Sequence, residues 1–301
     1  MASGQQHEDA AFLAALRDTA TQAARAGAAA IHAALDAPRN VQYKGALDLV
    51  TDTDKESELA VLAVLRAAWP DHAILGEEGG VTGRLESPYL WAVDPLDGTT
   101  NFSHSYPSFA CSVAVTRHGS PLACCVIEFC GGPRAWTTRE YSAAVGQGAT
   151  CNGQPLNGVT TTSELRRSLL VTGFGYDHGL DWEENLQLWR HFTDVCQGVR
   201  RLGAASVDLC HVALGVVDAY WEFQLKPWDM AAGALVLSEA GGTVTKGDGS
   251  PFTIFAKSII ASNGPLHGPV LEHVGAACGR LTASGFDLKD WYIPAGYDVR
   301  K

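Results

Sequence analysis

Two acidic residues and a run of small polar residues stand together in the segment WAVDPLDGTTNF at residues 91–102. Asp94 and Asp97 flank a Pro-Leu corner, and the run Gly98-Thr99-Thr100-Asn101 that follows is suited to the start of a helix. Carboxylates three residues apart across a bend can bind one or two hard cations, and free backbone N–H groups at a helix start can bind phosphate. The segment therefore predicts a joint metal and phosphate site, as metal-dependent phosphate chemistry requires.

A simpler interpretation of this segment is a plain surface turn, because Asp-Pro and Asp-Gly are common turn dipeptides. The apolar run at 89–93 favours the site instead, since it reads as a short buried strand. The two acids would then lie at the carboxyl end of a strand, where ligands bind in sheets that pack against helices.

Four more carboxylates stand at the ends of predicted elements. Glu77 follows a strand at 73–76, Asp48 and Asp54 bracket a short polar segment, and Asp229 lies in the first turn of an apolar helix. Each also has a simpler interpretation, because acids are favoured near helix N-termini and are common in loops. Two other motifs are incomplete. The EF-hand calcium loop that would begin at Asp52 lacks its glycine and its final glutamate. The run Gly173-Phe174-Gly175 lacks the third glycine of a dinucleotide-binding motif.

Composition narrows the class of protein. The chain has 301 residues and a formal net charge of -11, which argues against nucleic acid as a partner, because a phosphate backbone needs a basic surface. No apolar run is long enough to span a bilayer, and the start of the chain lacks the pattern of a secretory signal. The eight cysteines form no CxxC pair, so we expect reduced, mostly buried thiols rather than a zinc site or disulfides.

Hydrophobic periodicity predicts mixed α/β structure in two halves, with no repeat or linker between them. Helices are predicted at 8–36 (ended by Pro38 and Asn40), 55–68, 182–196, 205–215 and 228–240. Strands are predicted at 73–76, 89–93, 109–117, 121–130, 134–138, 168–173, 218–223, 243–244 and 258–262. We expect one catalytic domain over residues 1–301, with an α+β half at about 8–158, an α/β half at about 159–280, and an aromatic and polar tail at 281–301 that the patterns do not explain.

The acidic segments together resemble the inositol monophosphatase family. The motifs that carry the resemblance are Gly76-Glu77-Glu78, the segment 91–102, Trp228-Asp229-x-Ala231-Ala232-Gly233-Ala234 and Glu239-Ala240-Gly241-Gly242. They span roughly residues 10–275 in order and include both signature motifs of the family. The segment 198–229 and the tail sequence FDLKDWYIPAGY are most similar to its plant and algal plastid branch.

The resemblance implies a five-layered αβαβα sandwich of the inositol monophosphatase and fructose bisphosphatase type, two to three Mg²⁺ ions per subunit, lithium sensitivity and a homodimer. It implies that Glu77, Asp94 and the Leu96 carbonyl hold the first ion, that Asp94, Asp97 and Asp229 hold the second, and that Glu77 helps to hold a third through water. It also implies that Thr99 and Asp54 orient the attacking water. The implied substrate contacts are Asp97, Gly98, Thr99, Thr100, Gly203, Ala204, Ala205, Glu222 and Asp229, with Lys44 and Asp48 as a pair that flanks the metals.

Elementary chemistry agrees with these roles. Two cations can stabilise a leaving alkoxide and lower the pKa of an attacking water, and Mg²⁺ prefers a carboxylate-rich site that lacks histidine. We therefore expect a Mg²⁺-dependent phosphatase for a small phosphorylated polyol or sugar, with myo-inositol 1-phosphate first and histidinol phosphate, galactose 1-phosphate and fructose 1,6-bisphosphate as rivals. A relative that acts by binding a partner protein is the alternative from another class. The plastid branch implies the chloroplast stroma for a mature chain without its transit peptide; the cytoplasm is the alternative.

Overall fold

The structure is a computed structural model that describes residues 8–37, 39–45 and 48–291. Two expectations therefore fall outside the described residues: the part of Pro38 in ending the first helix, and the structure of the tail after residue 291.

Two helices form the first layer. They are α1 (Ala10–Ala33) and α2 (Asp52–Ala68), and they pack against each other. Asp9 caps α1 by accepting a hydrogen bond from the Ala11 amide at 3.1 Å. Leu13, Leu16 and Ala20 recur at helical spacing and are buried, so α1 turns one apolar face toward the sheet beneath it.

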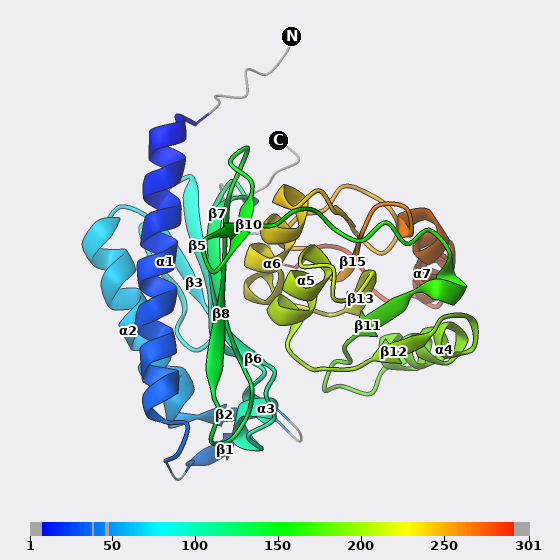
Figure 1. The fold of residues 1–301 in the computed structure, drawn as a ribbon, viewed down its shortest axis with the longest axis horizontal. Coiled ribbons are helices and arrows are strands. Elements are labelled where there is room, and N and C mark those ends of the chain that lie inside the picture. Colours follow the sequence, from blue (N-terminus) through cyan, green and yellow to red (C-terminus); the bar gives the residue numbers. More distant parts are fainter. Residues whose placement is uncertain (1–7, 38, 46–47, 292–301) are drawn as a thin grey trace.

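An eight-stranded sheet forms the second layer, in the order β10-β9-β8-β7-β6-β5-β3-β4. Its strands are β3 (Ala73–Gly76), β4 (Gly80–Gly83), β5 (Tyr89–Asp97), β6 (Phe109–Arg117), β7 (Ser120–Cys130), β8 (Thr137–Ala144), β9 (Ala149–Cys151) and β10 (Gln154–Pro155). The long strands β6 and β7 are buried on both faces because α1 covers one face and α6 (Pro227–Glu239) covers the other (Figure 1).

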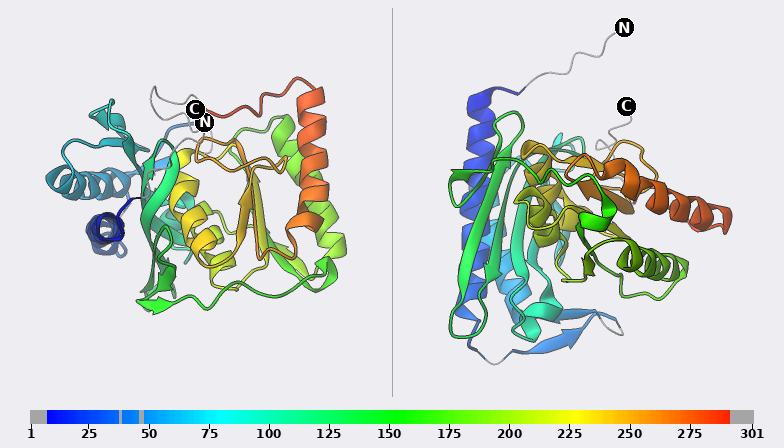
Figure 2. Two further views of the ribbon diagram at one scale, coloured as in Figure 1. Left: turned by 90° about the horizontal axis from the view of Figure 1, so that it is seen from above. Right: turned by 45° about the vertical axis from the view of Figure 1, so that its right-hand side comes forward.

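The remaining layers come from the second half of the chain. Helices α5 (Ala205–Ala213) and α6 form the third layer, and a five-stranded sheet in the order β12-β11-β13-β15-β14 forms the fourth. These strands are β11 (Leu169–Thr172), β12 (Gly198–Arg200), β13 (Ala219–Phe223), β14 (Thr243–Thr245) and β15 (Ser258–Ser262). Helices α4 (Leu180–Val195) and α7 (His267–Ala283) form the fifth layer, and Figure 2 shows the five layers in succession. The predicted αβαβα sandwich is confirmed.

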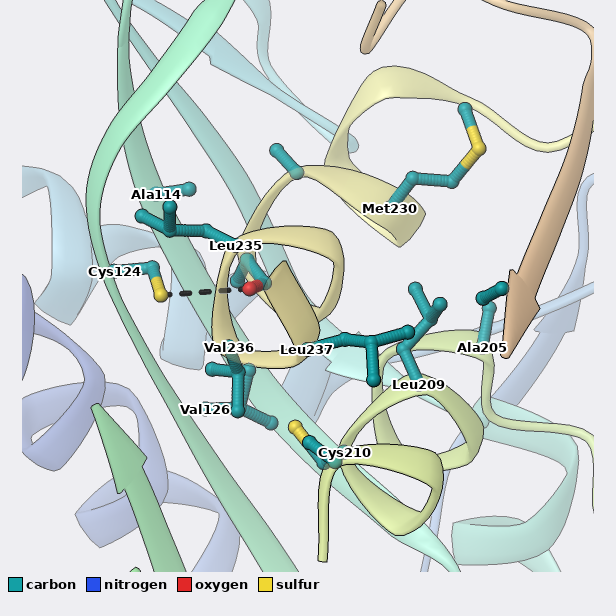
Figure 3. Packing of buried hydrophobic residues seen from close by; sticks show 14 of the residues in the cluster. Ala114, Cys124, Val126, Ala205, Leu209, Cys210, Met230, Leu235, Val236 and Leu237 are labelled. Atoms are coloured by element: carbon teal, nitrogen blue, oxygen red, sulfur yellow. Dashed lines mark hydrogen bonds between the residues drawn. The ribbon is translucent and has the colours of Figure 1, made fainter. Parts of the chain in front are cut away.

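The middle layer explains why α6 is apolar on all sides. Its residues Met230, Leu235, Val236 and Leu237 are buried between the two sheets and α5 (Figure 3). The helices α5 and α6 approach closely at Gly233, where a Cβ atom would lie 2.6 Å from that of Leu209. A helix buried between two sheets needs no polar face.

Short elements complete the fold. A hairpin of β1 (Val41–Tyr43) and β2 (Leu49–Thr51) precedes α2, the five-residue helix α3 (Thr99–Ser103) follows β5, and η1 (Leu165–Arg167) precedes β11. None of the helices in the described ranges is long and apolar enough to cross a membrane.

Several predicted elements were wrong or missing. The strand predicted at 134–138 begins only at Thr137, because Gly131, Gly132 and Arg134 adopt left-handed backbone angles and lengthen the turn. The helix α7 was not predicted, although Val270, Val274 and Leu281 recur on one face. The strands β4, β9, β10 and β12 were also missed; each has at most four residues, too few to show a period.

Candidate active site

Neighbouring parallel strands place Glu77 beside Asp94. Strand β3 pairs with β5, and the amide of Glu77 donates to the carbonyl of Val93 at 3.2 Å. The Glu77 carboxylate accepts a hydrogen bond from Lys44 Nζ at 3.0 Å, and Lys44 also pairs with Glu78. The carboxyl ends of two strands therefore bring a first pair of predicted ligands together, with the predicted flanking lysine against them.

The Pro-Leu corner interrupts β5 and turns its backbone toward the site. The register with β6 shifts between Asp94 and Asp97, and the Leu96 amide donates to Asp94 Oδ1 at 3.0 Å. The Ser57 hydroxyl of α2 donates to the Pro95 carbonyl at 2.7 Å, and this bond holds the corner against α2. A bulge of this kind commonly redirects side chains next to an active site.

Thr99 and Asp54 are in contact although 45 residues separate them. The Thr99 hydroxyl lies 2.9 Å from Asp54 Oδ1 and 3.0 Å from the Leu96 carbonyl, both acceptors for its single proton. The other oxygen of Asp54 accepts from the Thr51 amide at 2.7 Å and from the Thr51 hydroxyl at 2.5 Å. The Asp54 carboxylate is thus held as an acceptor, and Thr99 has lone pairs left for a water.

Asp97 joins the two halves of the chain. Its carboxylate accepts hydrogen bonds from the amides of Ala205 (3.2 Å) and Ser206 (2.7 Å) and from the Ser206 hydroxyl (2.5 Å), all at the start of α5. Asn101 adds a second link through its amide group, which donates to the Leu202 carbonyl at 2.7 Å. The predicted substrate contacts at 203–205 are therefore brought to the segment at 91–102.

Asp229 and Glu222 reach the site from the second half. The Asp229 carboxylate accepts from the Lys226 amide at 2.6 Å, an arrangement that closes the first turn of α6. Glu222 lies on β13 and accepts a hydrogen bond from the Tyr220 hydroxyl at 2.5 Å. A Cβ atom on Gly173 would lie 2.1 Å from a Glu222 oxygen, so any larger residue there would displace this carboxylate.

The electrostatics of these carboxylates show that they share one crowded, poorly solvated region. Burial raises the pKa of Asp94 well above its ordinary value, and the charges of Glu77, Asp97 and Asp229 raise it further. Burial likewise raises the pKa of Glu77 to about 7 and that of Asp97 to about 6, although Ser206 opposes the shift of Asp97. Such mutual repulsion favours a compensating cation.

The donor set fits a hard divalent cation in kind. It consists of carboxylate and carbonyl oxygens, which Mg²⁺ prefers. Within the described ranges, no three Asp, Glu, His or Cys side chains converge closely enough to form a ready-made metal cage. Each of these carboxylates instead accepts hydrogen bonds from protein donors such as Lys44, Ser206 and the Lys226 amide. These bonds orient the carboxylates and leave further lone pairs for a cation.

Three residues near this region were missed from the sequence. Glu58 is buried and accepts from the Glu78 amide at 2.9 Å, so it shapes the turn that carries Glu77. Ser206 binds Asp97, and Tyr176 lies near the site, since Asp48, Asp97 and Glu77 all act on its pKa, which burial raises. The Gly-Phe-Gly run before Tyr176 marks this segment in the sequence, although it lacks the third glycine of a cofactor motif.

Comparison with known proteins agrees with this geometry. Residues 13–277 match the model of the inositol monophosphatase family. The chain is 54% identical over 275 residues to a protein of Arabidopsis thaliana named phosphatase IMPL1, chloroplastic, covering 91% of this chain and 74% of that protein. It is 43% identical over 228 residues to the Nus factor SuhB of Pseudomonas aeruginosa, covering 74% and 82%.

A solved structure of an inositol monophosphatase from Anabaena superposes with a TM-score of 0.76 at 40% identity, covering 87% of this chain and 96% of that one. The family match, both relatives and the superposed structure each cover most of this chain. The chain therefore belongs to the inositol monophosphatase family, whose members hydrolyse phosphomonoesters.

Proposed function

We propose that this protein is a Mg²⁺-dependent phosphatase whose preferred substrate is myo-inositol 1-phosphate. The observation that carries the proposal is the group of mutually repelling carboxylates around Asp94, with Thr99 and Asp54 in hydrogen-bonding contact beside it. Two to three ions per subunit would be held by Glu77, Asp94, the Leu96 carbonyl, Asp97 and Asp229. When bound, the ions would neutralise the phosphate and stabilise charge on the attacking and leaving oxygens.

The protein groups have separate tasks in this proposal. Thr99 accepts a hydrogen bond from the attacking water and donates its own hydroxyl hydrogen bond to Asp54. The other oxygen of Asp54 accepts a hydrogen bond from the Thr51 amide. The backbone N–H groups of Gly98, Thr99 and Thr100 bind phosphate oxygens, because the first amides of a helix have no partner within the helix. Residues 203–205 and Glu222 contact the hydroxyl groups of the polyol.

A glutamate is well suited to this last task. A carboxylate accepts hydrogen bonds from two neighbouring hydroxyl groups, and burial strengthens such bonds. Glu222 is 8% exposed, and Tyr220 holds one of its oxygens. An ester with neighbouring hydroxyl groups is therefore favoured over histidinol phosphate, which has none. The choice of myo-inositol 1-phosphate over galactose 1-phosphate and fructose 1,6-bisphosphate rests on the family resemblance, and all three remain rival substrates.

The test is phosphate release from these four esters, measured as kcat/KM with Mg²⁺ and with EDTA. We expect release only with Mg²⁺, the highest value for myo-inositol 1-phosphate, and inhibition by lithium. The absence of metal-dependent release from every ester would contradict the enzymatic proposal. A higher kcat/KM for one of the rivals would replace the substrate and keep the reaction class.

A regulatory role through protein binding is the second candidate, favoured by the similarity to a protein named a Nus factor. The predicted ligands and the Thr99–Asp54 pair are all retained, which favours catalysis. We also propose a homodimer and, on the similarity to a protein named chloroplastic, a location in the chloroplast stroma. Analytical ultracentrifugation of the protein tests the homodimer, and fluorescence imaging of a tagged full-length protein in plant or algal cells tests the location.

A further inference from the structure

The start of the C-terminal tail packs against the residues that precede the helix carrying Asp229. The Trp291 indole donates to the Leu225 carbonyl at 2.6 Å, and its amide donates to the Phe255 carbonyl at 2.8 Å. These two bonds place the ring directly beside Lys226, the residue before α6. The tail therefore reaches the edge of the candidate active site.

The ring holds the charged end of Lys226. Lys226 Nζ lies 3.3 Å from the centroid of the Trp291 ring, and Lys257 Nζ lies 4.6 Å from the same centroid. Both distances lie within the range of a cation–π contact, so the Trp291 ring attracts both ammonium groups although these repel each other. Lys257 is further held by Asp287 at 3.6 Å, so the tail fixes both lysines.

Lys226 has a competing partner. The negative charge of Asp229 acts on its ammonium group, and the Lys226 amide already binds the Asp229 carboxylate. Within the described ranges, however, the Lys226 ammonium forms no ion pair with any carboxylate within 4.0 Å. A lysine side chain released from the ring would be free to turn to Asp229, because its stem is flexible and its charge is opposite.

We propose that Trp291 is a positioning residue for the active site, which holds the Lys226 ammonium group away from Asp229 and so keeps that carboxylate free to bind a cation. The inference rests on the proposed role of Asp229 as a metal ligand. It gives the start of the tail a role that no motif in the sequence indicates. It also makes the affinity for a metal ion depend on a side chain that is not itself a metal ligand.

A double-variant cycle tests this proposal by direct Mn²⁺ binding, followed from the loss of the free Mn²⁺ signal in electron paramagnetic resonance. Trp291→Ala should weaken Mn²⁺ binding by on the order of tenfold, the scale of a desolvated cation–π contact. Adding Lys226→Met to Trp291→Ala should restore most of the affinity, because the competing ammonium group is gone. Trp291→Phe should bind nearly as well as the wild type, because it keeps an aromatic face.

Trp189→Ala is the matched control, since Trp189 lies on the outer helix α4 and is 38% exposed. Wild-type affinity in Trp291→Ala would overturn the proposal. It would also be overturned if Lys226→Met failed to restore binding, or if Trp291→Phe bound as weakly as Trp291→Ala, because the tryptophan would then act through its indole hydrogen bond to the Leu225 carbonyl and not through its aromatic face. Mn²⁺ binding is read without turnover, so an inactive wild type would contradict the proposed function and leave this result interpretable.

Discussion

Asp97 and Ser206 are 109 residues apart in the chain, yet Asp97 Oδ2 accepts hydrogen bonds from both the amide and the hydroxyl of Ser206, at 2.7 and 2.5 Å. One carboxylate thus ends β5 of the first sheet and caps α5 of the middle layer. The contact joins the predicted metal segment to the predicted substrate segment. It also keeps Asp97 in a fixed orientation, with its remaining lone pairs available.

Replacing Ser206 with alanine tests this link. We expect Ser206→Ala to lower the free energy of unfolding by about 1.5 kcal/mol, the scale of a hydrogen bond to a charged group, and to lower kcat/KM about tenfold as Asp97 loses its orientation. Urea denaturation and phosphate release measure the two effects. Ser112→Ala is the control, because the buried Ser112 hydroxyl has no hydrogen-bond partner within the described ranges; equal effects in both variants would refute the link.

Neutralising Asp94 should separate activity from stability. The charges of Glu77, Asp97 and Asp229 all raise the pKa of Asp94 beyond what burial does, so Asp94→Asn relieves repulsion in the metal-free protein. We expect an equal or higher Tm without metal, together with at least about a 100-fold loss of kcat, since one such group contributes on that scale. Thermal denaturation in EDTA and phosphate release in Mg²⁺ measure the two. Turnover at the wild-type rate would show that Asp94 binds no essential cation.

The close approach of Gly173 to Glu222 should make substrate binding sensitive to one added methyl group. In Gly173→Ala the new Cβ would meet the Glu222 carboxylate at 2.1–2.3 Å and displace it. We expect KM for myo-inositol 1-phosphate to rise about tenfold, as for the loss of one polar contact to substrate, with a smaller change for p-nitrophenyl phosphate, which lacks the hydroxyl groups. Gly175→Ala is the control, because a Cβ there meets no described atom within 4 Å. Equal changes for both esters would argue against hydroxyl recognition by Glu222.

Glu222 also predicts a pH dependence of stability. Burial raises its pKa from 4.5 to about 7, so between these values the folded protein retains a proton that the unfolded chain has released. The stability of the wild type relative to Glu222→Gln should therefore fall as pH rises from about 4.5 to about 7 and level off above, by a total on the order of 3 kcal/mol. Urea denaturation of both proteins in EDTA across this range measures it. A difference that stays constant with pH would show that Glu222 titrates normally.

Much of the fold was predictable where a strand or helix shows its own period. The strands at 109–117 and 258–262 were placed at their observed bounds, because long apolar runs between turn residues leave little choice. The helix α7 was missed although its apolar face is regular, and β12 was missed because three residues carry no period. Strand β12 exists only because β11 supplies its hydrogen-bonding partner.

The sequence by itself determined the chemistry of the site: acids at Asp94 and Asp97 around a corner, a glycine that starts a short helix, and an acid in the first turn of an apolar helix. These features depend on residues within a few positions of each other, so local backbone preferences are sufficient to specify them. The bond between Thr99 and Asp54 and the cap of Asp97 on α5 were decided by tertiary structure. The cation–π contact between Trp291 and Lys226 was also decided by tertiary structure. Each of these contacts forms only when segments distant in the sequence pack together.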